Sequence, residues 1–200
     1  MQLNQLFPIP VAFFTFGREL TSTELDFISN QPQRSNMGNT SSEDNYLIDR
    51  PEMTALKDFF LESSNHFFRE IYQPKNQTQL RITQSWGNYT TPGQYHHKHA
   101  HPNSLVSGVY YVQTNPGLDR IYFYKSGYQQ IKFPTDTYNN FNSESWWFDA
   151  VQGQLILFPS YLEHMVQSVT EDKVTRISLS FNTFPTGHIG DHQELTELFL

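Results

Sequence analysis

The sequence predicts a mainly β (α+β) protein, a jelly roll with supporting N-terminal helices. Aromatic residues make up 16% of the 200 residues, which is typical of β-rich globular proteins. From residue 79 onward, short apolar runs alternate with turn residues, a spacing typical of sandwiches and jelly rolls. The length suits one domain. We expect helices within 1–78, the jelly-roll core in 79–184 and a tail in 185–200.

The N-terminal part predicts a strand at residues 9–16 and a short helix. Thr21 and Glu24 have the spacing of a capping box, which predicts a helix through Ile28. Residues 30–45 are polar and have no periodicity, so they are expected to form a long surface loop, with a lid over a site as an alternative.

A second helix is predicted from Pro51 to about Tyr72, because proline is tolerated in the first helical turn. One face of this helix is apolar. That face consists of Met53, Leu56, Phe60, Phe67 and Ile71. His66 lies within the helix and is expected to be a packing or surface residue.

The strand series follows residue 78. The predicted strands cover residues 79–91, 96–101, 105–113, 120–124, 146–148, 154–159, 164–169 and 174–184. Ile82, Gln84, Trp86 and Asn88 are predicted to share one strand face. Residues 126–145 are predicted to be irregular, and residues 195–200 to form a short helix. His188 and His192 are given no role.

Composition limits the function. The net charge of −7 argues against stable nucleic-acid binding, although a modified nucleic acid remains open as a transient substrate. The chain contains no cysteine, which excludes disulfides and thiolate metal sites. It has neither a secretory signal pattern nor an apolar run of membrane-spanning length. We therefore expect a soluble cytoplasmic protein with no membrane partner.

Four of the eight histidines fall within residues 96–101. His97, His99 and His101 alternate, so on a strand their side chains would point to one face. Imidazole is the commonest metal ligand in proteins, and the run predicts a metal site. The alternative is a surface histidine run. A cloning tag is disfavoured, because the run is internal and leads into an apolar strand.

Two further stretches complete a candidate site. An apolar strand at 154–159 is followed by a turn and by the single histidine His164. The strand from Arg176 alternates cleanly, with Arg176, Ser178, Ser180 and Asn182 on its polar face. A polar face between apolar strands predicts a lined cavity. Arginine is suited to binding a carboxylate, with a structural ion pair as the alternative.

The order His-x-His, distant His, then Arg-x-Ser resembles the iron(II)/2-oxoglutarate-dependent oxygenase superfamily. Within it, the chain is most similar to oxygenases found in phages of marine cyanobacteria and in some bacteria. The likeness covers most of 82–184. It runs through Ser85-Trp86-Gly87-Asn88-Tyr89, His99-Ala100-His101-Pro102-Asn103-Ser104, Ser107-Gly108-Val109-Tyr110-Tyr111, Leu157-Phe158-Pro159-Ser160 and Arg176-Ile177-Ser178 with Ser180-Phe181-Asn182.

The resemblance implies a double-stranded β-helix, the cupin-like jelly roll, and a dioxygenase that uses Fe(II), 2-oxoglutarate and O2. It places iron on His99, His101 and His164, and the distal carboxylate of 2-oxoglutarate on Arg176 with Ser178 beside it. Asn88, Tyr110 and Tyr111 are implied as further cofactor or substrate contacts. Oxidative decarboxylation of 2-oxoglutarate would drive oxidation of a substrate that the sequence does not identify. A phage-encoded enzyme would act in the host cytoplasm.

The sequence departs from the superfamily pattern at His101, where a carboxylate ligand is expected. Three histidines are also a catalytic zinc set, so a zinc-dependent cupin-like enzyme without 2-oxoglutarate is an alternative. His97 and His99 are an alternative upstream pair. A structural or carbohydrate-binding jelly roll is a third interpretation. The aromatic residues of 122–148 would suit that binding role, but we expect them to lie in the core and in a homodimer contact.

Overall fold

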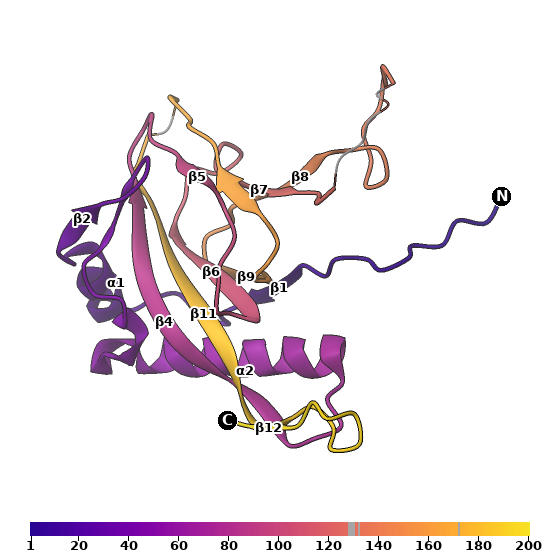
Figure 1. Ribbon diagram of the computed structural model, residues 1–200. Coiled ribbons are helices and arrows are strands. Elements are labelled where there is room, and N and C mark those ends of the chain that lie inside the picture. The colour runs from indigo at the N-terminus through magenta and orange to yellow at the C-terminus, as the bar shows by residue number, and fades with distance from the viewer. Residues whose placement is uncertain (128–130, 132, 172) are drawn as a thin grey trace.

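The computed structural model describes residues 1–200 except 128–130, 132 and 172. Two β-sheets face each other, and the long helix α2 (Thr54–Tyr72) crosses the larger sheet beside β4 and β11 (Figure 1). This arrangement confirms the predicted jelly roll with supporting helices. None of the helices in the described part combines the length and apolar character needed to span a membrane.

The larger sheet has the strand order β1-β9-β6-β11-β4-β3-β2, with β12 paired to β11. Its strands are β1 (Ala12–Thr15), β2 (Gln33–Ser35), β3 (Thr40–Ser42), β4 (Thr78–Thr90), β6 (Val106–Gln113), β9 (Gln154–Pro159), β11 (Arg176–Ile189) and β12 (Leu198–Phe199). The smaller sheet has the order β5-β10-β7-β8. Its strands are β5 (His96–His99), β7 (Arg120–Tyr124), β8 (Ser145–Asp149) and β10 (His164–Val166).

The N-terminal helices form where their start signals predict. Helix α1 (Ser22–Ser29) begins with the Thr21–Glu24 capping box, and both of its reciprocal hydrogen bonds are present. Helix α2 follows a 3₁₀ turn at Pro51–Met53. Its buried face includes Leu56 and Phe60 but not Ile71, which is 46% exposed, so the predicted face was one turn too long.

The alternation on β11 separates the apolar core from a polar cavity. Ile177, Leu179 and Phe181 belong to the core between the larger sheet and α2, where Phe181 stacks on Phe60 with ring centres 4.8 Å apart. The opposite face of β11 turns toward the smaller sheet. A second apolar cluster lies between the two sheets and includes Ile121, Phe123 and Phe158. The cavity between the sheets is therefore lined partly by this apolar cluster and partly by the polar face of β11.

Several local predictions were wrong. Residues 30–45 contain the hairpin β2–β3, which pairs with β4, and Ser41 and Ser42 are buried rather than lying in an exposed loop. Residues 195–200 contain β12 instead of a helix. Ile82 leaves the face of Gln84, Trp86 and Asn88 because a bulge shifts the β4–β11 register there, and it packs on the apolar core.

The described residues of 126–145 contain no strand before Ser145. Residues 128–130 and 132 of the predicted irregular stretch lie outside the described part of the chain. The predicted strand at 164–169 ends earlier, at Val166, and the predicted strand from 174 begins at Arg176.

Candidate metal centre

Three imidazoles converge where the smaller sheet meets the polar face of β11. His99 is the last residue of β5 and pairs across the sheet with His164, the first residue of β10. His101 follows β5 by two residues, and its backbone N–H donates to the carbonyl of Ser160 at 2.9 Å. The Nε2 atoms of His99 and His101 are 3.1 Å apart, and one nitrogen from each of the three histidines lies within 4.8 Å of the others.

Hydrogen bonds fix the tautomer of all three rings. The Nδ1 atoms of His99 and His164 lie 2.8 and 3.0 Å from the backbone carbonyls of His97 and Leu162. The Nδ1 of His101 lies 2.6 Å from the side-chain oxygen of Asn182. These oxygens can only accept, so each Nδ1 carries the proton and each Nε2 presents a lone pair. Such partners are typical of metal-binding histidines, because they orient the ring and raise its basicity.

Burial keeps the triad neutral. It lowers the pKa of His101 to about 4, against the hydrogen bond that His101 donates to Asn182, which raises the pKa. Burial also lowers the pKa of His99 and, further below the usual range, that of His164, where His99 and His101 add to the effect. Neutral imidazole is the metal-binding form, so the site is ready for a cation at neutral pH.

His97 does not join this triad, although the alternation of 97, 99 and 101 placed it on the same face. It lies with His96 and His99 in a second, overlapping group. The predicted upstream pair, His99 and His101, lies with His164. The predicted alternative pair, His97 and His99, lies instead with His96.

Arg176 occupies the far end of the cavity between the sheets. Its Nη1 donates to Oδ1 of Asp119 at 2.8 Å, and both side chains are buried. Its Nη2 is also buried and has no hydrogen-bond partner within the described residues. Because an unpaired buried donor is costly, this nitrogen marks a place for an acceptor such as a carboxylate.

The same cavity contains most of the other predicted contacts. Its lining includes Arg176, Ser178, Asn88 and Tyr111 together with the three histidines of the triad. The Nδ2 of Asn88 donates to Ser180 at 2.9 Å, while its Oδ1 is buried without a partner in the described part of the chain. These positions agree with the predicted roles in location.

The prediction for Tyr110 was wrong in location. Successive residues of a strand point to opposite faces, so Tyr111 faces the cavity and Tyr110 faces α2. Tyr110 is buried in the apolar core, 5.5 Å from the ring of Phe60 between centres. It cannot contact a cofactor in the cavity.

Sequence reasoning missed the partners of the site residues. Asp119 lies after a turn and has no motif around it. Asn182 was placed on the polar face, but its contact with His101 was not anticipated. Ser107 donates to Asn182 at 2.9 Å and also contacts Nδ1 of His101 at 2.9 Å. The only signal in the sequence for a role of Ser107 was its place in Ser107-Gly108-Val109-Tyr110-Tyr111, one of the stretches that carry the resemblance to the oxygenases.

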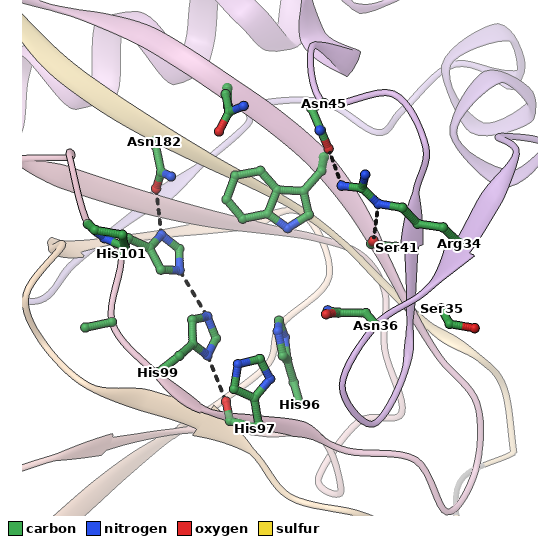
Figure 2. A pocket seen from close by; sticks show the side chains of 14 residues that line it. Arg34, Ser35, Asn36, Ser41, Asn45, His96, His97, His99, His101 and Asn182 are labelled. Atoms are coloured by element: carbon green, nitrogen blue, oxygen red, sulfur yellow. Dashed lines mark hydrogen bonds between the residues drawn. The ribbon is translucent and has the colours of Figure 1, made fainter.

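A larger, more open cavity of about 440 Å³ leads to the triad. Figure 2 shows the histidines on one side and Arg34, Asn36 and Asn45 on the other. Trp86 also lines this cavity, with its ring centre 5.8 Å from that of His101. Arg34 is held by Asn45, whose oxygen accepts from Nη2 at 2.8 Å. The volume is in the range of small-molecule sites.

These features define a class of protein: a jelly roll with three neutral histidines that could hold a metal ion and a buried arginine in the same cavity. A family model described as "Putative 2OG-Fe(II) oxygenase" matches residues 84–182, which contain all four of these side chains. This match covers 99 of the 200 residues and supports an oxidoreductase that uses Fe(II) and 2-oxoglutarate. No curated protein matches the chain.

Solved structures share the fold at low identity. An oxidoreductase of the 2OG-Fe(II) oxygenase family from Burkholderia pseudomallei is 14% identical, with a TM-score of 0.56 over 79% of this chain and 74% of that chain. A prolyl-4-hydroxylase from Pseudomonas putida is 13% identical, with a TM-score of 0.55 over 87% and 92%. HygX from Streptomyces hygroscopicus, with nickel and 2-oxoglutarate bound, is 13% identical, with a TM-score of 0.56 over 88% and 82%.

Proposed function

We propose that His99, His101 and His164 bind Fe(II) and that Arg176, with Ser178 beside it, binds the distal carboxylate of 2-oxoglutarate. The observation that carries the proposal is the buried, unpartnered Nη2 of Arg176, which lines the same cavity as three Nε2 lone pairs. Three neutral nitrogen donors fit a divalent transition metal and leave positions open for a chelating co-substrate and O2.

O2 would be the oxidant, and iron and 2-oxoglutarate, when bound, would activate it. One O2 and one 2-oxoglutarate would then give succinate, carbon dioxide and the oxidised, usually hydroxylated, substrate. The chain's own residues perform the rest. Asn182 and the two backbone carbonyls orient the imidazoles, and Arg176 fixes one end of the co-substrate. Apolar residues such as Phe158 keep the inner cavity dry. The larger cavity beside Trp86 is the entry path for the substrate.

The test needs no primary substrate. Metal-free protein is loaded anaerobically with Fe(II), 2-oxoglutarate is added, and the visible metal-to-ligand charge-transfer band is recorded. We expect a band in the wild type that is lost in His164→Ala and in Arg176→Ala. His192→Ala is the matched control, because His192 is exposed and remote from the cavity, and it should keep the band.

A second candidate is a three-histidine zinc enzyme that does not use 2-oxoglutarate. The neutral residue His101 at the position of the expected carboxylate is the observation that favours it. In that case the wild type retains zinc on purification and gives no charge-transfer band. Replacing Arg176 would then lower stability, through its buried pair with Asp119, without removing a group that contacts the zinc or the substrate.

We also propose that the protein acts in the cytoplasm as one domain and forms a homodimer. The support for a dimer is the edge strand β8, where Trp146 and Trp147 are 39% and 41% exposed. Light scattering of the wild type and of a Trp147→Ala variant tests this. A monomer at all concentrations contradicts it. A phage origin is kept as an expectation from the resemblance alone.

A further inference from the structure

A second group of histidines shares His99 with the triad. His96, His97 and His99 each offer a nitrogen that lies within 4.8 Å of the other two. We call these three residues the outer set, and His99, His101 and His164 the inner set. The ring centres of His96 and His97 lie 4.6 and 4.7 Å from that of His99. His99 is thus the common member of two possible ligand groups.

A β-bulge brings His96 and His97 to the same side. His99 pairs with His164 and His96 pairs with Val166, so β5 has one more residue than β10 between these two pairs. Such an extra residue interrupts strict alternation and redirects side chains. Lys98 points elsewhere, to an ion pair with Glu163 at 2.9 Å. The bulge therefore presents three of the four residues of β5 to one cluster.

The two sets differ in depth. The open cavity is lined by His96, His97, His99 and His101, whereas His164 lines only the inner one. His97 lines only the open cavity. Figure 2 shows His96 and His97 on the side of His99 that faces Asn36, away from His101. His96, His99 and His101 line both cavities, so an ion in the open cavity can reach all of the outer set before it reaches His164.

One ring nitrogen of His97 lacks a hydrogen-bond partner among the described residues. Its Nδ1 is buried and makes no hydrogen bond to any described residue. A buried imidazole nitrogen without a partner is rare, and each instance calls for an explanation such as a bound ion. Two neighbouring imidazoles at coordination range supply that explanation, because imidazole suits Fe, Ni, Cu and Zn.

The outer set and the inner set cannot each hold a metal ion at the same time. The Nδ1–H of His99 donates to the carbonyl of His97, so His99 has a single lone pair, on Nε2. One lone pair binds one metal ion. An ion held by the outer set must therefore leave it before, or as, the inner set takes an ion through the same nitrogen.

We propose that His96, His97 and His99 form an outer binding site for a divalent transition metal, which receives the ion at the cavity mouth and passes it to the inner set. This inference rests on the proposed function for the inner set only. His99 stays bound during the transfer, while His96 and His97 are exchanged for His101 and His164. The chain then acts as its own metal-loading device.

The test compares Co(II) binding by metal-free protein in a double-mutant cycle. His164→Ala breaks the inner set with the least disturbance, and the variant His96→Ala/His97→Ala breaks the outer set. With the inner set broken, removing His96 and His97 takes away two of the three ligands of the outer set and should weaken Co(II) binding by more than the roughly 10–100-fold that loss of a ligand's hydrogen-bond partner costs. With the inner set intact, it should leave affinity nearly unchanged but slow the association in stopped flow. His192→Ala is the control for loss of a surface histidine.

Each outcome decides the proposal. Equal Co(II) affinity of His164→Ala with and without the outer pair overturns the outer site. Two ions bound at once to the wild type overturn the exchange through His99, and wild-type association rates without the outer pair overturn the loading role. The charge-transfer band of Fe(II) and 2-oxoglutarate reports the inner site separately. If this band is absent, the proposed function is rejected, while the comparison of cobalt affinities remains valid.

Discussion

Asp119 and Arg176 form a fully buried ion pair, with Oδ1 of Asp119 at 2.8 Å from Nη1 of Arg176. The other carboxylate oxygen of Asp119 accepts from the backbone N–H of Asn115 at 2.7 Å. Both oxygens are therefore engaged, and the guanidinium is fixed with Nη2 turned to the cavity. The site thus has one carboxylate, that of Asp119, beside the arginine rather than at the position of His101.

Removing Asp119 should destabilise the protein strongly. Asp119→Ala leaves the Arg176 guanidinium buried without a counter-charge, which costs about 3–5 kcal/mol in such pairs. Chemical denaturation monitored by circular dichroism measures the change in the free energy of unfolding. Asp149→Ala is the control, because its pair with Arg120 is exposed and should contribute at most about 1 kcal/mol. A loss for Asp119→Ala no larger than this control would contradict the ion-pair argument.

A negative charge at position 101 and one at position 119 should have equivalent effects on the binding of 2-oxoglutarate. His101→Asp adds a negative charge next to the metal and should weaken binding of the 2-oxoglutarate dianion by roughly tenfold. Asp119→Asn removes one and should strengthen it by a similar factor. The double variant should return near the wild-type affinity. Anaerobic titration of the charge-transfer band measures all four proteins, and a double variant that binds more weakly than His101→Asp alone would reject this account.

Asn182 should control metal affinity through His101. Asn182→Ala removes the acceptor of the Nδ1 proton and should weaken metal binding by about 10–100-fold, as loss of such partners does elsewhere. Asn182→Asp keeps an acceptor and should keep most of the affinity. Competition with a chelator measures both variants. If both bind the metal like the wild type, Ser107 alone orients the ring.

The sequence predicted which residues line the cavity where a short-range pattern dictates geometry. The alternation of β11 predicted which residues line the cavity, because a strand with one apolar and one polar face has a single stable orientation between a core and a cavity. The Thr21–Glu24 box likewise fixed the start of α1. Both depend only on residues two or three positions apart.

Features that depend on pairing between distant strands were not predictable in this way. The bulge that gathers His96 and His97 exists only because β5 pairs with β10, about 65 residues away by sequence number, and the β4–β11 bulge moves Ile82 in the same manner. Tyr110 and Asp119 illustrate the same limit. The resemblance implied that Tyr110 contacts a cofactor or substrate, but its position in the alternation of β6 turns its side chain to the core. Asp119 gains its role only from its contact with Arg176.

Glu24 should make the fold sensitive to acid. Its carboxylate accepts from both terminal nitrogens of Arg18 at 2.7 and 2.8 Å and from the backbone of Thr21 at 2.7 Å. The hydrogen bond from Arg18, with those from Thr21, lowers its pKa to about 2 from 4.5, against the opposing effect of burial. The charged form is thus favoured in the folded state.

The stabilisation from Glu24 is fully present above about pH 4.5 and is lost as the pH falls toward 2, where the folded protein also takes up the proton. Glu24→Gln should therefore lower the free energy of unfolding at neutral pH by about 1–2 kcal/mol, less than a fully buried charged hydrogen bond because Arg18 is partly exposed. Denaturation between pH 7 and pH 2 should show the difference from wild type shrinking toward the acid end. A constant difference between Glu24→Gln and wild type across this range would mean that packing, not charge, holds α1 in place.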